Sequence, residues 1–535
     1  MTATPDLAAA ADALDAAGAV VDAAVGVLAR DGIDARQVLA YEAAHAAAAV
    51  ATGRGLLDYG AKGDLEAAIT CAFVADAVGD LAGKVFGREA EWGVDAGALD
   101  GTRGFLAAYR DPAFLAAIDQ PGPRHLDDDF ELVQDTFRRF ADKELAPIAE
   151  HIHRTNGDIP EEIISGLAEL GAFGLSIPVD YGGYGEGGEG EYIGMVVATE
   201  ELSRGSLGAG GSLITRPEIL ARALLAGGTE EQKHEWLPRL ASAEVMNAVA
   251  VTEPDYGSDV AGVKVTATPT DGGWLVNGVK TWCTFGARAD VLLLLARTDP
   301  DRTKGHRGLS MFIAPKPRGD GHGFEIVQDA VDGAPGGGKM EGRPIDTIGY
   351  RGMHSYEIAL EDWFVPAANL IGLDEGQGRG FYYQMAGFEN GRIQTAARAL
   401  GVMQAAYEAA RQYALDRSVF GQPIAEYQLT QAKLGRMAVV IQASRQFAYV
   451  VARLMAKGEG RMEASLIKAY VCKAAEWVTR EAMQIHGGMG YAEEYDVSRY
   501  FVDARVLSIF EGADETLCIK VIARALVAAH DAAPA

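Results

Sequence analysis

The stretch that decides the fold is residues 251–286, which read VTEPDYGSDVAGVKVTATPTDGGWLVNGVKTWCTFG. It opens with a loop that contains Pro and Gly, passes into alternating apolar and polar residues, and includes the pair Asn277-Gly278. Asn-Gly within such a pattern is a strong short-range signal for a β-hairpin, so we predict a turn there. The apolar runs at 291–296 and 309–314 are typical of buried strands. These patterns predict a β domain in the middle of the chain.

The regions on either side have the periodicity of helices. Within residues 1–120, apolar side chains from Ile69 to Val85 recur at helical spacing, and we expect glycines at 53, 55, 60 and 63 to divide this region into segments. Two long apolar stripes in 393–414 and 434–455, with shorter helices at 463–486 and 515–530, indicate a four-helix bundle. The predicted fold class is therefore mainly α with a central β domain. The predicted domains are an extra N-terminal helical domain at 1–120, a second helical domain at 124–246, the β domain at 247–370 and the C-terminal bundle at 377–535.

Charge and composition exclude several classes of function. The chain of 535 residues has a formal net charge of −27, which argues against nucleic acid as a partner because such binding depends on Lys and Arg. It contains no run of 18 apolar residues, so we expect no membrane span. The first residues lack the basic side chains of a presequence, and the four cysteines have no CxxC spacing. We expect a cytoplasmic protein without disulfides or a metal site.

Three segments, in order along the chain, resemble the motifs of a known family. They are residues 251–262 followed by 277–286, residues 417–421 (RSVFG) with Gln428, and residues 484–488 (QIHGG) followed by 509–512 (IFEG). Together they are similar to the flavin-binding and catalytic motifs of the acyl-CoA dehydrogenases, over roughly residues 124 to 530. The resemblance implies that family's fold, an FAD cofactor, an acyl-CoA substrate and at least a homodimer, because the FAD site is shared across subunits.

The resemblance also assigns roles to individual residues. The loop and strand around Thr252, Trp282 and Thr284 would contact the flavin ring, and Arg417 with Phe420 and Gln428 would contact the adenosine diphosphate of the neighbouring subunit's FAD. The full set of expected cofactor-binding residues is Val249, Val251, Thr252, Gly257, Ser258, Trp282, Cys283, Thr284, Arg417, Phe420, Gln428, Gln484, Ile485, Gly487, Gly488, Ala513 and Glu515. The expected substrate-binding residues are Ser258, Glu389, Arg392, Gly512 and Arg216. Without the resemblance, Cys283 is more simply interpreted as a small buried apolar residue.

The same resemblance implies that Glu511 is the catalytic base; without it, a Glu before Gly is more simply interpreted as a solvated loop residue. The proton next to a thioester carbonyl is weakly acidic, so a carboxylate kept away from water must remove it. Some family members place the base at the position of Gly391, where this chain has no side chain. The family's usual Thr-x-Gln or Thr-x-Glu after Glu-Gly is here Ala513, Asp514 and Glu515, so a hydroxyl contact to the cofactor is missing.

The extra N-terminal domain and the Glu-Gly-Ala-Asp-Glu variant most resemble family members that oxidise (2S)-methylsuccinyl-CoA to mesaconyl-C1-CoA in the ethylmalonyl-CoA pathway. Electrons would pass to electron-transfer flavoprotein. The alternatives are another short, branched-chain or glutaryl-type dehydrogenase, an acyl-CoA oxidase, or a non-enzymatic relative, against which the presence of Glu511 argues. Because methylsuccinyl-CoA carries a free carboxylate, its pocket should hold a cation. Arg216 is the candidate; a surface ion pair with Glu218 or Glu200 is the competing interpretation.

Overall fold

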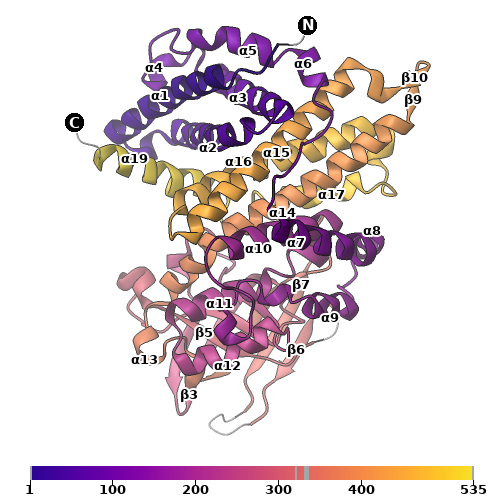
Figure 1. Cartoon of the computed structure of the whole chain (residues 1–535). Coiled ribbons are helices and arrows are strands. Elements are labelled where there is room, and N and C mark those ends of the chain that lie inside the picture. Colours follow the sequence, from indigo (N-terminus) through magenta and orange to yellow (C-terminus); the bar gives the residue numbers. More distant parts are fainter. Residues whose placement is uncertain (1–2, 320–321, 331–335, 533–535) are drawn as a thin grey trace. The chain divides into compact units, whose positions relative to one another are not determined.

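The computed structural model describes residues 3–319, 322–330 and 336–532, and the chain divides into two compact units (Figure 1). Unit 1 comprises Met1–Gln134 and Thr395–Ala535, and unit 2 comprises Asp135–Gln394. Each unit therefore has its own core, and the boundary between them passes through the long helix α14 (Gly380–Asp416).

The N-terminal part of unit 1 is built on three long helices. Their bounds are α1 (Leu7–Asp31), α2 (Gln37–Gly60) and α3 (Asp64–Val85), followed by the shorter α4 (Glu89–Trp92), α5 (Arg103–Tyr109) and α6 (Pro112–Ala116) and by α7 (Asp128–Phe140), which crosses the boundary. Helix α2 runs through Gly53 and Gly55, so the break expected there is wrong. A Cβ at Gly53 would lie 2.6 Å from Cδ2 of Leu14, so this glycine allows close packing of α1 on α2.

The C-terminal part of unit 1 confirms the predicted long helices. Its elements are α14 from Thr395 onward, the hairpin β9 (Ser418–Val419) and β10 (Gln422–Pro423), α15 (Gln428–Ala456), α16 (Arg461–His486), α17 (Val497–Val506), α18 (Asp514–Thr516), a π-helical turn at Leu517–Ile522, and α19 (Ala523–Ala532). Helix α2 packs on α15 and α16, and α1 lies beside α19, so the first and last helices of the chain are neighbours (Figure 1).

Unit 2 combines short helices with a mixed sheet. Its helices are a π-helical turn at Ala141–Leu145, α8 (Ala146–Thr155), α9 (Glu161–Glu169), α10 (Glu189–Gly205), a second π-helical turn at Leu207–Gly211, α11 (Arg216–Gly227), α12 (Glu230–Ala241) and α13 (Leu373–Gly376). Helix α12 starts with a capping box in which Thr229 and Gln232 bond each other's backbone N–H groups.

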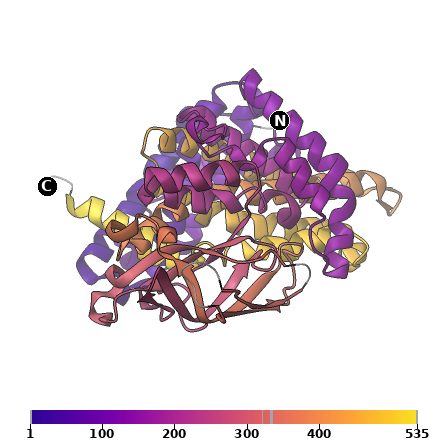
Figure 2. The same cartoon turned by 90° about the horizontal axis from the view of Figure 1, so that it is seen from below.

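The strands confirm the predicted β domain. They are β1 (Asn247–Ala250), β2 (Thr266–Thr270), β3 (Gly273–Thr284), β4 (Val291–Arg297), β5 (Leu309–Pro315), β6 (Phe324–Val327), β7 (Lys339–Ile345) and β8 (Ser355–Pro366). The described strands run in the order β1-β4-β2-β3-β8-β7-β6, and β5 also pairs with β4. Strand β4 is parallel to β1 and antiparallel to β5. Figure 2 shows these strands as the pink to orange arrows.

The predicted hairpin turn at Asn277-Gly278 is wrong. Both residues lie inside β3, which continues from Gly273 to Thr284. The pairing of β3 with β8 shifts register between Val276 and Gly278, where Asn277 alone opposes Glu361 and Asp362, so β8 carries a bulge here and β3 runs on without a turn. The hairpin between β2 and β3 turns instead at Asp271-Gly272, where Gly272 has a φ of 76°. The side chain of Asn277 bonds both the backbone N–H and the carboxylate of Asp362 across the bulge.

The two apolar runs of the sequence lie at the centre of the core. Every residue of β4 is buried, and so is all of β5 except its last residue. Leu293, Leu295 and Ile313 pack in one apolar cluster with residues of α11 and α12. In the described part of the chain, no helix is both long and apolar enough to cross a membrane.

The four cysteines are free and buried, and the burial of Cys283 agrees with its interpretation as a small apolar residue. Burial raises the pKa of the Cys283 thiol to about 12 and the pKa values of Cys71 and Cys472 to about 11, and it also raises the pKa of Cys518. Since the thiolate is the reactive form, these thiols should be inert in the folded protein.

We expect the native protein to resist iodoacetamide at pH 7.5 and to show four reactive thiols once it is denatured. Mass spectrometry of the labelled, digested chain measures both states. Rapid labelling of native Cys283 would show that solvent reaches the flavin-loop strand and would contradict its assignment as a buried apolar residue.

Candidate active site

The turn that carries Glu511 has an unusual backbone. It spans residues 508–514 and joins α17 to α18. Glu511 has a φ of 52° and Gly512 a φ of 99°, so two successive residues adopt the left-handed region. For a residue with a side chain this conformation costs about 1–2 kcal/mol, and it persists where the surroundings hold it. The Nζ of Lys468 donates to the carbonyl oxygen of Gly512 at 2.7 Å and supports the turn.

Both oxygens of the Glu511 carboxylate are engaged. Arg398 Nη2 donates to Oε1 at 2.6 Å, and Thr395 Oγ1 donates to Oε2 at 2.8 Å. The side chain of Glu511 is 11% exposed, and that of Arg398 is fully buried. The guanidinium also lies over the ring of Phe510, 4.8 Å from its centroid. The carboxylate is thus held in one orientation by a charged and a neutral donor.

In unit 2, a buried ion pair anchors the loop that begins at Val251. Lys280 Nζ donates to Glu253 Oε1 and to the carbonyl oxygen of Val251, both at 2.9 Å. The Glu253 carboxylate also accepts from the backbone N–H groups of Lys264 and Val265, at 2.6 and 2.9 Å. Burial lowers the pKa of Lys280, and the charge of Glu253 opposes this effect. The backbone of the expected flavin loop is therefore fixed from its buried side.

Strand β3, which carries Lys280, also carries an exposed aromatic ring. Trp282 is 55% exposed although its neighbours Thr281 and Cys283 are buried. Its φ of 57° coincides with a second register shift between β3 and β8. Two residues further on, the Thr284 hydroxyl lies 3.0 Å from the Ser355 hydroxyl. Gly257 and Ser258 are exposed in the preceding loop, and an added Cβ at Gly257 would meet no atom within 4 Å. The bulge in β3 thus turns the indole of Trp282 toward solvent.

A second group of expected cofactor residues lies on the surface of unit 1. Phe420, at the tip of the β9–β10 hairpin, is 99% exposed. Arg417, Gln428, Gln484, Gly487 and Gly488 are also exposed, and Ile485 is half-buried. Tyr413 stacks on His486 with 4.2 Å between ring centroids, which brings the ends of α14 and α16 together. The motifs at 417–421 and 484–488 therefore belong to one region of the surface, with Phe420 exposed on it.

Of the residues expected to bind substrate, the structure describes the side chains of Arg216 and Arg392 but not that of Glu389. Arg216 is 5% exposed, begins α11, and donates from Nε to the carbonyl oxygen of Ser212 at 3.2 Å. Among the described residues no ion pair joins it to Glu218 or Glu200, and Glu218 lies 3.6 Å from Arg222 instead. Arg392 is half-buried on α14, and the side chain of Glu389 lies outside the described part of the chain. A buried arginine without a carboxylate partner can receive an anionic group.

Comparison with known proteins identifies the family. Models of the N-terminal, middle and C-terminal domains of acyl-CoA dehydrogenase match residues 127–244, 248–363 and 378–527. A (2S)-methylsuccinyl-CoA dehydrogenase of Cereibacter sphaeroides is 45% identical over 410 residues, which are 76% of this chain and 71% of that protein. The chain belongs to the acyl-CoA dehydrogenase family of FAD-dependent oxidoreductases. The isovaleryl-CoA dehydrogenase of Solanum tuberosum is 34% identical over 73% of this chain and 88% of that protein.

Solved structures confirm the acyl-CoA dehydrogenase fold. Butyryl-CoA dehydrogenase of Megasphaera elsdenii matches 75% of this chain and 99% of that chain with a TM-score of 0.67 and 31% identity. A glutaryl-CoA dehydrogenase of Mycobacterium smegmatis in complex with FADH2 matches 75% of this chain and 95% of that chain with a TM-score of 0.64 and 27% identity. Residues 1–126 lie outside the matched family models.

The residues of this acyl-CoA dehydrogenase fit an FAD group. In unit 2, the exposed indole of Trp282 can lie against a flat ring, and the Thr284 hydroxyl can bond a polar group of that ring. In unit 1, the exposed Arg417 can bond the phosphates of an FAD. An added Cβ at Gly421, Gly487 or Gly488 would meet no atom within 4 Å, so the backbone there is open to a ligand.

Sequence reasoning missed three residues around the predicted base. Arg398 and Thr395 bond Glu511, but they lie within 393–414, where the apolar spacing indicates only a buried helix. Asp514 bonds Tyr41 and His45 of α2, more than 460 positions away. The one available signal was an arginine within an apolar stripe, since a buried arginine needs an acidic partner.

We expect Glu253→Ala to destabilise the β domain strongly, because it leaves the ammonium of Lys280 buried without its partner. Breaking a buried ion pair costs about 3–5 kcal/mol. Thermal unfolding should show a lowered midpoint, and the double variant Glu253→Leu/Lys280→Met should recover part of the loss.

The matched control is Asp255→Ala. Asp255 pairs with Lys264 at 3.3 Å, but the two side chains are 74% and 45% exposed. Such a surface pair contributes about 0–1 kcal/mol, so its midpoint should barely move. Equal effects of Glu253→Ala and Asp255→Ala would mean that the buried pair does not hold the loop.

Proposed function

We propose that this acyl-CoA dehydrogenase binds FAD and oxidises (2S)-methylsuccinyl-CoA to mesaconyl-C1-CoA, with Glu511 as the base and electron-transfer flavoprotein as the electron acceptor. The observation that carries the proposal is the Glu511 carboxylate, held in the turn at 508–514 by Arg398 and Thr395. The 45% identity with the methylsuccinyl-CoA dehydrogenase of Cereibacter sphaeroides supports the substrate. This reaction would place the protein in the ethylmalonyl-CoA pathway.

In this proposal Glu511 removes a proton from the carbon next to the thioester carbonyl. Arg398 has only donors, so its bond to Oε1 favours a charged carboxylate at that oxygen. Thr395 has a hydroxyl that can either donate or accept. The proton therefore enters at Oε2, and the Thr395 hydroxyl then turns to accept from the protonated acid. Gly512 leaves space beside the carboxylate, since an added Cβ there would meet no atom within 4 Å.

FAD, when bound, would supply the two-electron acceptor for the oxidation of the bond between the α and β carbons. Trp282, Thr252 and Thr284 would hold its ring in one subunit. Arg417, Phe420 and the segment 484–488 would contact the adenosine diphosphate of a second subunit's cofactor, and the exposure of Phe420 supports such a shared site. The active form would then be at least a homodimer.

The substrate's free carboxylate requires a cationic partner in a pocket away from water. Arg216 is buried and bonds only a backbone carbonyl in the described residues, so its guanidinium has donors to offer. We assign it to the carboxylate of methylsuccinyl-CoA.

We expect Glu511→Gln to lose turnover by at least about 10²–10⁴-fold, because the amide cannot accept the proton. The amide keeps the shape of the carboxylate and can bond both Arg398 and Thr395, so acyl-CoA binding and flavin content should be retained. Assays with a ferrocenium-type dye give the rate, and calorimetry gives the binding. Glu494→Gln, at an exposed carboxylate in the loop before α17, is the control and should retain full activity. A Glu511→Gln rate within tenfold of wild type would place the base elsewhere.

We expect Arg216→Gln to lower kcat/KM for methylsuccinyl-CoA by roughly tenfold to a hundredfold, since a hydrogen bond to a charged group contributes about 1.5–3 kcal/mol. Activity with the uncharged analogue 2-methylbutyryl-CoA should fall much less. Arg239→Ala, which removes a surface pair with Glu244, is the control. Equal losses on the two substrates would mean that Arg216 supports the fold or the CoA moiety rather than the carboxylate.

A further inference from the structure

Besides the bonds of Arg398 and Thr395 to Glu511, three further contacts among the described residues hold this turn. Helix α16 supplies two of them, because Lys468 bonds the carbonyl of Gly512 at 2.7 Å and Glu476 accepts from the Ser508 hydroxyl at 2.5 Å. The backbone N–H of Asp514 closes the turn on the carbonyl of Ser508 at 3.0 Å. The side chain of Asp514 is the third anchor, at the end of the turn nearest α18.

The partners of that third anchor come from the N-terminal helices. Tyr41 Oη donates to Asp514 Oδ2 at 2.5 Å, and His45 Nε2 lies 3.1 Å from the same oxygen. Lys473 Nζ adds a positive charge 3.6 Å away. Burial raises the pKa of Asp514, but the bonds from His45 and Tyr41 and these charges outweigh it and bring that pKa to about 2. Asp514 is therefore ionised and held at any physiological pH.

We propose that Tyr41 and His45 are positioning residues for the catalytic base: through Asp514, the N-terminal helix α2 fixes the turn that presents Glu511. The inference rests on the proposed role of Glu511 and gives residues 1–126, which lie outside the family models, a part in the reaction. A misplacement of about 1 Å at a reacting group can lower a rate about 10²-fold, so the anchor need not touch the substrate to matter.

Cys518 completes this cluster, with its Sγ 3.9 Å from Asp514 Oδ1. Its atoms, with those of His45 and Asp514, lie close enough for a metal site. However, Oδ2 of Asp514 already accepts the Tyr41 hydroxyl and faces His45 Nε2, which saturates that oxygen by hydrogen bonding. We therefore treat the cluster as a hydrogen-bonded anchor.

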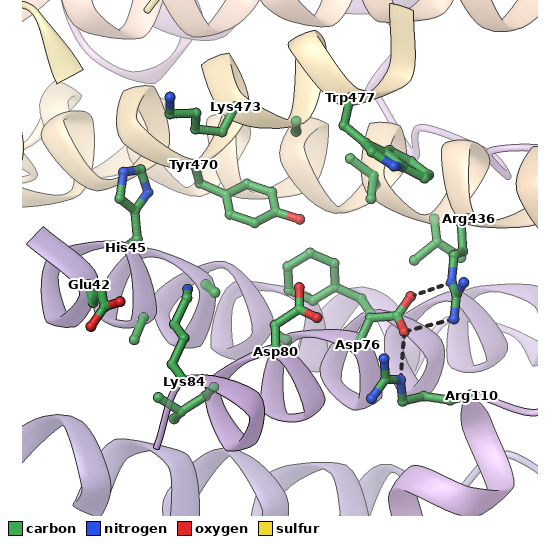
Figure 3. A pocket seen from close by; sticks show the side chains of 18 of the residues that line it. Glu42, His45, Asp76, Asp80, Lys84, Arg110, Arg436, Tyr470, Lys473 and Trp477 are labelled. Atoms are coloured by element: carbon green, nitrogen blue, oxygen red, sulfur yellow. Dashed lines mark hydrogen bonds and ion pairs between the residues drawn. The ribbon is translucent and has the colours of Figure 1, made fainter. Parts of the chain in front are cut away.

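A cavity within unit 1 borders Tyr41 and His45, the two partners of Asp514. It has a volume of about 530 Å³ and is lined by residues of α2, α3, α15 and α16. Figure 3 shows His45 and Lys473 at one end and, at the other, Asp76 held by Arg110 and Arg436. Because the His45 ring borders this space, a small molecule can occupy the volume that a shorter side chain would leave.

The test compares His45→Ala and Tyr41→Phe with the control Lys84→Ala. Lys84 lines the same cavity from α3 but does not bond Asp514. Hydrogen–deuterium exchange of the peptide that contains residues 508–514 reports directly on the turn. We expect His45→Ala and Tyr41→Phe to raise its exchange at least severalfold and to lower kcat about tenfold with little change in KM. The Lys84→Ala variant should match the wild type in both measurements.

Chemical rescue shows whether His45 positions the turn at 508–514 or only supports the fold of unit 1. Imidazole added to His45→Ala can enter the cavity and bond Asp514, so it should restore both the protection of residues 508–514 and most of kcat. It should not rescue Asp514→Ala, which removes the acceptor. The Tyr41→Phe variant deletes a single hydroxyl and keeps the ring, so it tests the anchor even if His45→Ala does not fold.

Unchanged exchange of residues 508–514 in both variants would overturn the inference. So would a loss of protection spread evenly over the N-terminal helices without rescue by imidazole. The exchange measurements do not depend on turnover, so an inactive wild-type enzyme would count against the proposed function while leaving the anchor itself measurable.

Discussion

The interaction on which the active-site half of the structure depends is the buried ion pair between Arg398 and Glu511. A carboxylate that is 11% exposed has little water to stabilise its charge, and the fully buried guanidinium supplies that stabilisation at 2.6 Å. The pair also explains why α14 carries an arginine in the middle of an apolar stripe. Because the turn at Glu511 and Gly512 is conformationally strained, the bond to Arg398 and the support from Lys468 are both needed to keep it in one geometry.

Unit 2 also contains a buried ion pair, between Lys280 and Glu253, in which each charge stabilises the other away from water. Both side chains are buried. The Glu253 carboxylate accepts from Lys280 and from two backbone N–H groups, and the Lys280 ammonium donates to Glu253 and to the carbonyl oxygen of Val251. With the loop fixed on its buried side, the register shift near Trp282 can turn a large aromatic ring to the surface. The exposure of Trp282 thus follows from the bulge in β3, next to a loop that the ion pair of Lys280 and Glu253 fixes.

The N-terminal helices are part of unit 1 rather than an appendage to it. Helix α2 packs on α15 and α16, and its Tyr41 and His45 bond the residue three positions after the base. Residues that the sequence indicates only as packing therefore contact the turn that carries the proposed base.

The sequence alone determined the elements whose pattern is local. The apolar runs at 291–296 and 309–314 predicted β4 and β5 because buried strands must be apolar on both faces, and helical spacing predicted α3, α14 and α15. Glu511 and the cofactor motifs were predicted from short, ordered segments. The predicted turn at Asn277-Gly278 was wrong because pairing with β8 overrides the turn preference of these residues. The predicted break at Gly53 was wrong because this glycine lies inside a helix, where it allows close packing on Leu14. Only the tertiary structure decided the partners of Glu511 and Asp514. Arg398 lies 113 positions from Glu511, and Tyr41 lies 473 positions from Asp514. A local sequence pattern cannot predict such contacts, because it does not specify which distant polar groups the fold brings together.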